Sequence, residues 1–343
     1  MKMSFRTVAF TTVLKDCIHP ILILFLRHTQ KYLQLFQALA LSHESTSQKR
    51  ALSIDTPNIT QRMPKQAWDC HMHVTSPDYP LAPTAAYTPS LHSLQHAMKF
   101  ESSIGVPNIV LVQPSIYGND NSCLLDALKE IGPRHGRGVV GIDPNRIELA
   151  TLKEWHELGV RGVRLNLKSN NTQFTEQSLH VTLNHYAAAI KSLNWVLELF
   201  IGMEDIPLLE RVSGDLGVKL CIAHFGAPTL PPVEKRTHPI NPYALTGFQS
   251  LVNLLRGGNT WVKFSAAYRF DADPEMRGIE ALAKELLQVA GDRIVFASDW
   301  PHTRFDGLDV KPFVDKCLQW TDAEGLSEEV FVRNASMLWD VEG

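Results

Sequence analysis

The sequence lacks several features that would define its class at once. It has no excess of charge of one sign, because 33 Lys and Arg stand against 36 Asp and Glu in 343 residues. We therefore expect neither a nucleic acid nor an anionic membrane as a partner. It has only five cysteines, none of them in a CxxC pair, which argues against a disulfide framework and for reduced thiols. No GxGxxG motif follows the first predicted strand, which counts against a dinucleotide-binding fold.

Long apolar runs are also absent. The run Ile21–Leu26 near the N-terminus is far shorter than the roughly 20 residues needed to cross a bilayer. The first 50 residues carry seven Lys or Arg against Asp16 and Glu44 alone, a balance that resembles a mitochondrial transit peptide. The alternatives are a disordered extension or an artefact of gene prediction. We predict an N-terminal extension over residues 1–65, one domain over residues 66–343, and a cytoplasmic location, with mitochondrial import as the alternative.

What is present is a regular alternation of strand-like and helix-like segments from Gln66 onward. The predicted strands are Ala67–His71, Asn108–Gln113, Gly138–Ile142, Gly162–Leu167, Trp195–Phe200, Lys219–Ala223, Thr260–Phe264 and Arg293–Ala297. The predicted helices are Leu91–Ser103, Ser122–Ile131, Glu148–Leu158, Ser178–Leu193, Ile206–Val212, Pro242–Leu255 and Glu275–Ala290. Gly159, Gly217 and Gly291 follow such helices, where a left-handed residue can end them. Eight strands alternating with helices predict an α/β fold, a (β/α)₈ TIM barrel.

Polar side chains stand at the carboxyl ends of these strands. His71 and His73 are two residues apart, so both point to one face of the first strand, and Asp69 is expected to share it. His224 follows the sixth strand and Asp299 the eighth. Because β/α barrels place catalytic residues at the carboxyl ends of their strands, we expect these side chains to meet in one site. The alternatives are histidines held by hydrogen bonds in the core and an aspartate that caps a helix.

Six segments resemble the amidohydrolase superfamily, in its amidohydrolase-2 branch, and within it the 2-pyrone-4,6-dicarboxylate lactonases. They are DCHMHV from Asp69, QPSIYGNDN from Gln113, GVRGVRLN from Gly159, HFGAP from His224, KFSAAYR from Lys263 and SDWPH from Ser298. The similarity runs from about Trp68 to Trp339, which is nearly all of the chain after the leader. The resemblance implies a metallo-dependent-hydrolase-like barrel and the hydrolysis of a lactone ring.

The resemblance also implies a role for each side chain. Asp299 would be the general base that removes a proton from water, a step that contributes roughly 10²–10⁴-fold to a rate. The lactone carbonyl would be polarised by His71, His73 and His224. The substrate's carboxylates would be held by Arg164, Arg269, Tyr87, Ser115 and Asn119. Arginine suits this task because its planar fork binds a carboxylate through two hydrogen bonds.

A metal ion is the main alternative to this scheme. Zinc-binding members of the superfamily use a histidine on strand five and a bridging group on strand four, and neither Trp195–Phe200 nor Arg164–Leu167 offers one. We therefore do not expect a binuclear centre. A single Zn²⁺ with an open position could still be bound by His71, His73, His224 and Asp299. The lactonases that the chain resembles work without metal, so we expect no cofactor.

The chain departs from the lactonase pattern around the substrate. Strand five offers Leu199 or Phe200 where the lactonases place a tyrosine, and Ala227 stands where they have an arginine. We therefore expect a small carboxylated lactone of the pyrone or muconolactone kind, with fewer anionic groups or more apolar surface than the dicarboxylate. Two other functions stay open: a mononuclear zinc-dependent decarboxylase of an aromatic acid, and a barrel that binds without catalysis. The oligomeric state is open, with a homo-oligomer as one option.

Overall fold

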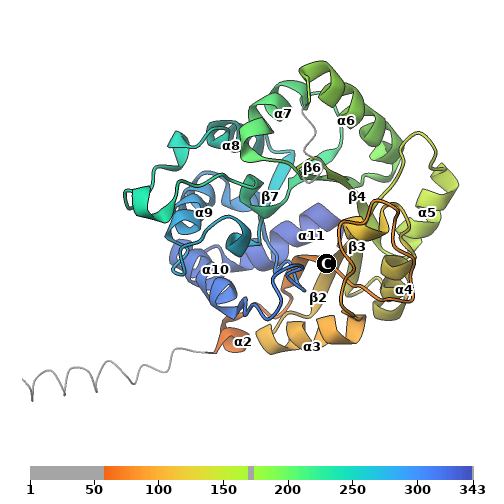
Figure 1. The fold of residues 1–343 in the computed structure, drawn as a ribbon, viewed down its shortest axis with the longest axis horizontal. Coiled ribbons are helices and arrows are strands. Elements are labelled where there is room, and N and C mark those ends of the chain that lie inside the picture. Colours follow the sequence, from red (N-terminus) through yellow and green to blue (C-terminus); the bar gives the residue numbers. More distant parts are fainter. Residues whose placement is uncertain (1–57, 169–173, 342–343) are drawn as a thin grey trace, which may run out of the picture. The chain divides into compact units, whose positions relative to one another are not determined.

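The fold is a barrel of eight parallel strands surrounded by helices (Figure 1). The computed structural model describes residues 58–168 and 174–341. The strands are β1 (Trp68–Met72), β2 (Asn108–Val112), β3 (Gly136–Val140), β4 (Val160–Asn166), β5 (Val196–Phe200), β6 (Lys219–Ile222), β7 (Thr260–Phe264) and β8 (Ile294–Phe296). They pair in chain order from β1 to β8. The prediction of a (β/α)₈ barrel is confirmed, and each predicted strand agrees with an observed one to within two residues at either end.

The helices lie outside the strands, as amphipathic segments of a barrel must. They are α2 (Ile59–Arg62), α3 (Leu94–Ile104), α4 (Ser122–Ile131), α5 (Leu149–Glu157), α6 (Glu176–Ile190), α7 (Ile206–Val212), α8 (Phe248–Arg256), α9 (Arg277–Ala290), α10 (Lys311–Glu324) and α11 (Asn334–Trp339). All seven predicted helices are present, although α8 begins at Phe248 because Pro242–Ala244 forms a separate short turn. Helices α10 and α11 were not predicted.

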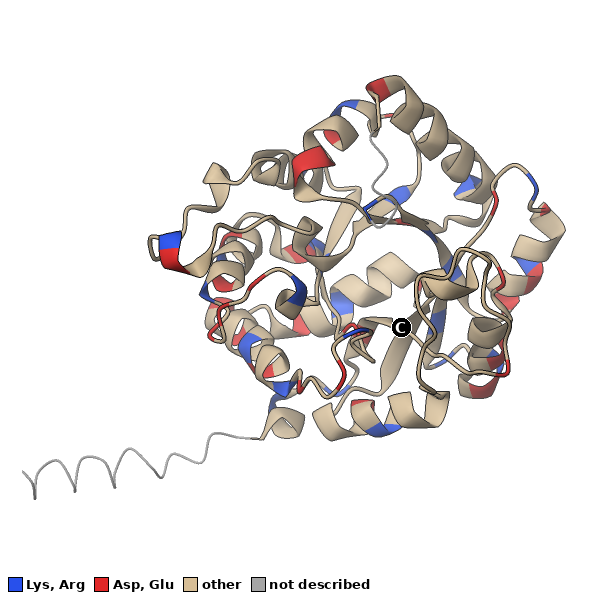
Figure 2. Ribbon diagram, viewed as in Figure 1, with Lys and Arg blue, Asp and Glu red and all other residues tan. Residues whose placement is uncertain are grey.

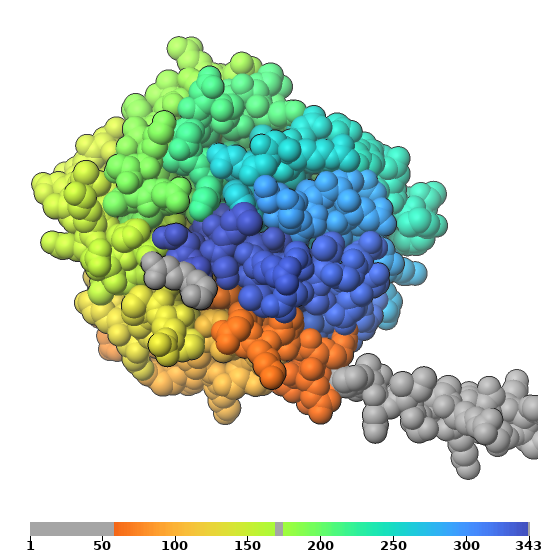
Figure 3. All heavy atoms as spheres, turned by 180° about the vertical axis from the view of Figure 1, so that it is seen from behind, coloured from red at the N-terminus to blue at the C-terminus, as the bar shows by residue number. Residues whose placement is uncertain are grey.

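Two apolar layers hold the barrel together. The outer layer lies between strands and helices, and the inner layer fills the barrel from Trp68 and Trp261 up to Ala297. Helix α11 closes the amino-terminal end, where Trp339 packs against the inner layer. Figure 3 shows these C-terminal residues at the centre of that face. A Cβ on Gly162 would lie 2.9 Å from the backbone oxygen of Val196 on the neighbouring strand, so glycine allows the close approach of β4 and β5.

The seam between β8 and β1 is closed by a side chain as well as by backbone. The register of β1 against β2 shifts between Asp69 and Met72, which is a β-bulge. Asp69 Oδ1 accepts hydrogen bonds from the backbone N–H groups of His71 and Ser298, both at 3.0 Å. The prediction that Asp69 shares a face with His71 is wrong, because the bulge changes the alternation of the strand. Asp69 faces α3 instead, where its carboxyl group interacts with Glu101.

Two of the three predicted left-handed glycines are confirmed. Gly159 has φ +106° and Gly217 has φ +66°. Gly291 has φ −57°, so the prediction is wrong there. The chain continues from α9 into a further helical turn at Gly291–Arg293 and needs no reversal.

Helix α2 is fixed to the barrel, since Arg62 forms an ion pair of 2.5 Å with Asp315 of α10. Residues 59–62 fall in the predicted N-terminal extension. The division into residues 1–65 and 66–343 stays a prediction, because residues 1–57, with the basic leader, lie outside the described residues. Among the residues described, no helix combines the length and the apolar character needed to cross a membrane. Acidic and basic residues are interspersed over the outer helices (Figure 2).

Candidate active site

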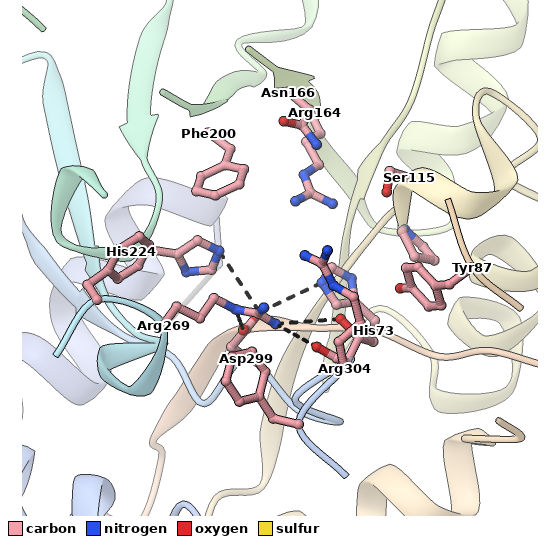
Figure 4. Close-up of a pocket in the computed structure, with 14 residues that line it drawn as sticks. His73, Tyr87, Ser115, Arg164, Asn166, Phe200, His224, Arg269, Asp299 and Arg304 are labelled. Carbon is pink, nitrogen blue, oxygen red and sulfur yellow. Dashed lines mark hydrogen bonds and ion pairs between the residues drawn. The ribbon is translucent and has the colours of Figure 1, made fainter. Parts of the chain in front are cut away.

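A cavity of about 470 Å³ opens at the carboxyl ends of the strands (Figure 4). Its lining includes seven of the predicted site residues, namely His73, Tyr87, Ser115, Arg164, His224, Arg269 and Asp299. His71 is fully buried beside the cavity, with its ring 4.9 Å from that of His73 and 4.8 Å from that of His224. Asn119 is exposed on the loop after β2 and does not line the cavity. The barrel therefore brings together all the predicted site residues except Asn119.

Asp299 is the centre of this site, and its two oxygens have different surroundings. Oδ2 accepts hydrogen bonds from the Tyr268 hydroxyl at 2.6 Å and from Arg269 Nε at 2.9 Å. Oδ1 lies 3.6, 3.8 and 4.0 Å from the Nε2 atoms of His71, His73 and His224. These distances exceed hydrogen-bond length. Oδ2 is thus held by protein donors, and Oδ1 is the oxygen that can receive a water molecule.

The backbone at this site is held in an unusual conformation. Asp299 has φ +62° and His224 has φ +56°, a region that side chains other than glycine rarely adopt. The Asp299 N–H donates to His71 O at 2.9 Å, so the turn after β8 is tied to β1. Such strained residues persist where the surrounding fold determines them, and they concentrate at functional sites.

The charges of the site follow from its burial. Burial alone would raise the pKa of Asp299, but electrostatic interactions with His224, Arg269 and His71 outweigh it and lower that pKa below its ordinary value. Burial lowers the pKa of His73 and of His224 to about 4. At neutral pH the site therefore contains an ionised carboxylate among neutral imidazoles. Each neutral imidazole carries one N–H, and its position decides what the ring can do.

The partner of each Nδ1 atom constrains where that proton lies. His73 Nδ1 is 2.7 Å from the backbone oxygen of Val112, which can only accept, so Nδ1 carries the proton and Nε2 has a lone pair. His224 Nδ1 is 2.7 Å from Ser265 Oγ, a hydroxyl that can donate or accept. The three histidines are therefore not equivalent.

A buried ion pair beneath His71 was missed in the sequence analysis. Lys263 Nζ on β7 lies 2.5 Å from Glu198 Oε2 on β5, and both side chains are fully buried. The sequence contained a signal for this pair, because Glu198 and Lys263 each stand inside an apolar strand. A charge buried in a strand needs a partner of opposite charge. Tyr268 was missed as well, although it lies within the KFSAAYR segment.

The three arginines that line the cavity have different partners. Arg269 is committed to Asp299 through the bond already described. Arg164 donates from Nη1 to the backbone of Gln113 at 2.8 Å, while its buried Nε has no hydrogen-bond partner among the described residues. Arg304 also lines the cavity and was not predicted. Arg164 and Arg304 thus supply positive charge at the cavity (Figure 4).

Phe200 occupies the strand-five position at the cavity, where the lactonase pattern has a tyrosine. It lines the cavity with its ring centre 5.1 Å from that of His224. Leu199 is fully buried in the outer core instead. This wall of the cavity is therefore apolar, in agreement with the expected loss of a hydroxyl.

A metal ion is only partly compatible with the site. The ligand atoms of His71, His224 and Asp299 lie within 4.8 Å of one another, a spacing that could hold one ion. Metal binding through Nε2 requires a lone pair there, and Nδ1 usually donates its proton to an acceptor. His73 meets this condition. His71 Nδ1 has two neighbours at 3.2 Å, the Lys263 ammonium group, which can only donate, and Glu198 Oε1, which can only accept.

Comparisons with known proteins show the family of this chain. Residues 68–341 match the family model for amidohydrolases. A 4-sulfomuconolactone hydrolase of Hydrogenophaga intermedia is 30% identical over 285 residues, which cover 81% of this chain and 89% of that protein. A 2-pyrone-4,6-dicarboxylate hydrolase of Comamonas testosteroni is 27% identical over 252 residues, which cover 70% of this chain and 78% of that protein.

Solved structures show the same fold. A crystal structure from Pseudomonas putida, assigned as a candidate 2-pyrone-4,6-dicarboxylic acid hydrolase, is 31% identical with a TM-score of 0.66 and covers 82% of this chain and 100% of that one. An amidohydrolase from Burkholderia multivorans with bound zinc has a TM-score of 0.64 at 16% identity, covers 81% of this chain and 100% of that one, and shows the fold alone. Since the family model covers most of this chain and its barrel holds the expected His and Asp residues, the protein is a hydrolase of the amidohydrolase family.

Proposed function

We propose that this protein hydrolyses the ring ester of a small carboxylated lactone of the pyrone or muconolactone kind. The observation that carries the proposal is the asymmetric environment of Asp299, with Oδ2 held by two donors and Oδ1 facing neutral imidazoles. The relatives named above as hydrolases of a sulfomuconolactone and of a pyrone dicarboxylate support this substrate class.

Water is the nucleophile in this proposal, and two acceptors hold it. Asp299 Oδ1 and His73 Nε2 are 3.8 Å apart, so one water molecule can donate a hydrogen bond to each. The water oxygen attacks the carbonyl carbon while Asp299 takes one proton. The ring C–O bond then breaks, and the proton passes from Asp299 to the leaving ring oxygen. The lowered pKa of Asp299 keeps it ionised before attack and makes its acid form a ready donor afterwards.

The carbonyl oxygen requires donors, because negative charge develops on it during attack. A donor placed at such an oxygen contributes about 2.7–4 kcal/mol. His224 can supply one through Nε2 when Ser265 donates to its Nδ1. His73 was expected from the sequence to polarise the carbonyl as well, but its bond to the backbone of Val112 favours a role in holding water.

The substrate's carboxylate pairs with Arg164 in this arrangement. The guanidinium group of Arg164 lines the cavity and can supply charge-assisted donors there. The rest of the ring lies against the apolar wall that contains Phe200. These features favour a lactone with a carboxylate on one side and apolar surface on the other.

A substrate panel tests the proposal. Purified protein is mixed with pyrone, muconolactone and aromatic-acid substrates, and both ring opening and CO₂ release are measured. We expect ring opening with a carboxylated lactone and its loss by about 10²-fold or more in Asp299→Asn, with Asp306→Asn, an exposed site on the same loop, as the matched control. Unchanged turnover in Asp299→Asn, or CO₂ release from an aromatic acid, would contradict the proposal.

A further inference from the structure

We propose that Lys263 and Glu198 are a positioning pair that fixes the proton of His71 on Nε2, so that His71 serves as a hydrogen-bond donor and not as a metal ligand. The pair does not line the cavity, and it acts through His71. Its catalytic meaning rests on the lactone hydrolysis proposed above, whereas the proton position is a property of the free protein.

The hydrogen bonds of Lys263 account for all of its donors. Its Nζ lies 2.6 Å from the backbone oxygen of Cys70, 2.5 Å from Glu198 Oε2 and 3.2 Å from His71 Nδ1. An ammonium group has three N–H donors and no acceptor. Each donor thus has one partner, and the third partner must offer a lone pair. His71 Nδ1 is that partner, so the single proton of the neutral ring lies on Nε2.

Glu198 offers His71 the opposite arrangement. Its Oε1 lies 3.2 Å from His71 Nδ1, and an N–H at Nδ1 could donate to it. Among the described residues, however, Glu198 Oε1 has no hydrogen-bond partner. The distance from His71 Nδ1 would allow a hydrogen bond, so the angle at the Nδ1 proton must be unfavourable. A histidine that donates to a carboxylate in this way presents an Nε2 lone pair, as metal-binding histidines do. The contact with Lys263 therefore determines whether His71 Nε2 is a hydrogen-bond donor or a possible metal ligand.

The surroundings hold Lys263 in this position. Its side chain is fully buried, and its Nζ lies 5.1 Å from the centre of the Trp339 ring, which closes the barrel from below. A lysine cation over an aromatic ring in a desolvated place is attracted to it. The ammonium group is therefore enclosed by Trp339, Glu198, Cys70 and His71.

The consequence is that the two histidines of the HxH motif present opposite chemistry to the cavity. His73 has a lone pair on Nε2, because its Nδ1 donates to Val112. His71 has an N–H on Nε2, which is buried without a hydrogen-bond partner among the described residues and lies 3.6 Å from Asp299 Oδ1. A donor beside the reacting carboxylate suits a carbonyl oxygen or its oxyanion. A zinc ion bound by both histidines would need two lone pairs.

Nitrogen NMR of the intact protein tests the proton position directly. Histidine is labelled with ¹⁵N, and the ring signals of His71 and His73 are identified by their loss in His71→Gln and His73→Gln. We expect wild-type His71 to be protonated at Nε2 and His73 at Nδ1. Wild-type His71 protonated at Nδ1 would overturn the proposal without any variant of the pair.

Variants of the pair provide the second measurement. Lys263→Met leaves Glu198 as the sole partner, so the proton of His71 should move to Nδ1. Removal of one member of a buried ion pair can prevent folding. A double variant, Lys263→Met with Glu198→Gln, is therefore made in parallel, because it leaves no unpaired charge. Lys219→Met is the matched control on β6, where Nζ bonds to the backbone of Met337 at 3.0 Å. In the double variant the introduced amide can donate or accept, so the proton should no longer be confined to Nε2. A His71 proton that stays on Nε2 in Lys263→Met would overturn the proposal.

Zinc binding and kinetics separate this inference from the proposed function. The double variant should bind Zn²⁺ about 10–100-fold more tightly than wild type, as expected when the outer partner of a ligand changes. Its kcat should fall about 10²-fold with a smaller change in KM, because a donor to the reacting oxygen is lost. Stoichiometric tight zinc in wild type would overturn the inference. Failure to open any lactone, with the expected proton positions, would contradict the proposed function alone.

Discussion

Replacing Glu101 by glutamine should stabilise the protein at neutral and alkaline pH and change little at acid pH. Glu101 on α3 is fully buried, and burial together with the neighbouring Asp69 raises its pKa well above the ordinary 4.5. Its two oxygens have no hydrogen-bond partner among the described residues apart from the interaction with Asp69. Glu101 is therefore protonated in the folded state and ionised in the unfolded state over a wide range of pH.

The size of the effect follows from proton linkage. Above pH 4.5 the folded protein binds one more proton than the unfolded protein, so the free energy of unfolding falls by about 1.4 kcal/mol for each pH unit. The decline continues until the folded-state pKa is reached. Three pH units correspond to about 4 kcal/mol, which is the upper bound at pH 7.5. The amide in Glu101→Gln keeps a donor for Asp69 and does not titrate. The variant therefore does not lose this part of the free energy of unfolding as the pH rises.

Urea unfolding at pH 5, 6.5 and 8 measures the difference. We expect the gain of Glu101→Gln over wild type to be small at pH 5 and to grow with pH. Glu154→Gln, at an exposed position in α5, is the control and should follow wild type at each pH. A variant that is less stable at pH 8, or whose curve runs parallel to that of wild type, would refute the protonated state of Glu101.

Three further predictions concern the cavity. The value of kcat/KM should be level above pH 5 and fall towards pH 4, because protonation of His73, whose pKa is about 4, removes the lone pair that holds water. A level profile down to pH 3 would contradict this. Arg164→Met should raise KM about 10–100-fold, which corresponds to the roughly 1.5–3 kcal/mol of a charged hydrogen bond. Arg161→Met is the control and should leave KM unchanged. An unchanged KM in Arg164→Met would show that Arg164 does not bind the substrate. Phe200→Tyr should lower KM for 2-pyrone-4,6-dicarboxylate more than for a monocarboxylated lactone, and equal effects on both would show that this wall does not select the substrate.

The barrel could be predicted from sequence because its signal is local. Each strand is a short apolar run, and each predicted helix has its own amphipathic pattern, so the periodicity specified them separately. Helix α10 has a proline in its first turn and a left-handed Gly325 at its end, signals that were missed. The packing of α11 inside the barrel depends on strands that lie far away in the chain. The direction of Asp69 was also out of reach, because a β-bulge depends on pairing with a neighbouring strand.

The same distinction holds for the site. His71, His73, His224 and Asp299 could be found because each follows a strand, and the carboxyl ends of parallel strands meet. The proton position on each ring could not be found, because it depends on Val112 and on the Lys263–Glu198 pair across the barrel. Tyr268 and Arg304 lie on loops, whose course the strand pattern does not specify.

The central claim is that Asp299 activates water for lactone hydrolysis without a metal ion. The most direct test measures ring opening by protein that has been treated with a chelator and shown by elemental analysis to contain no stoichiometric metal. We expect full ring-opening activity in this protein, unchanged when Zn²⁺ or Mn²⁺ is added back. Activity that disappears on chelation and returns with metal in proportion to the ion bound would contradict it.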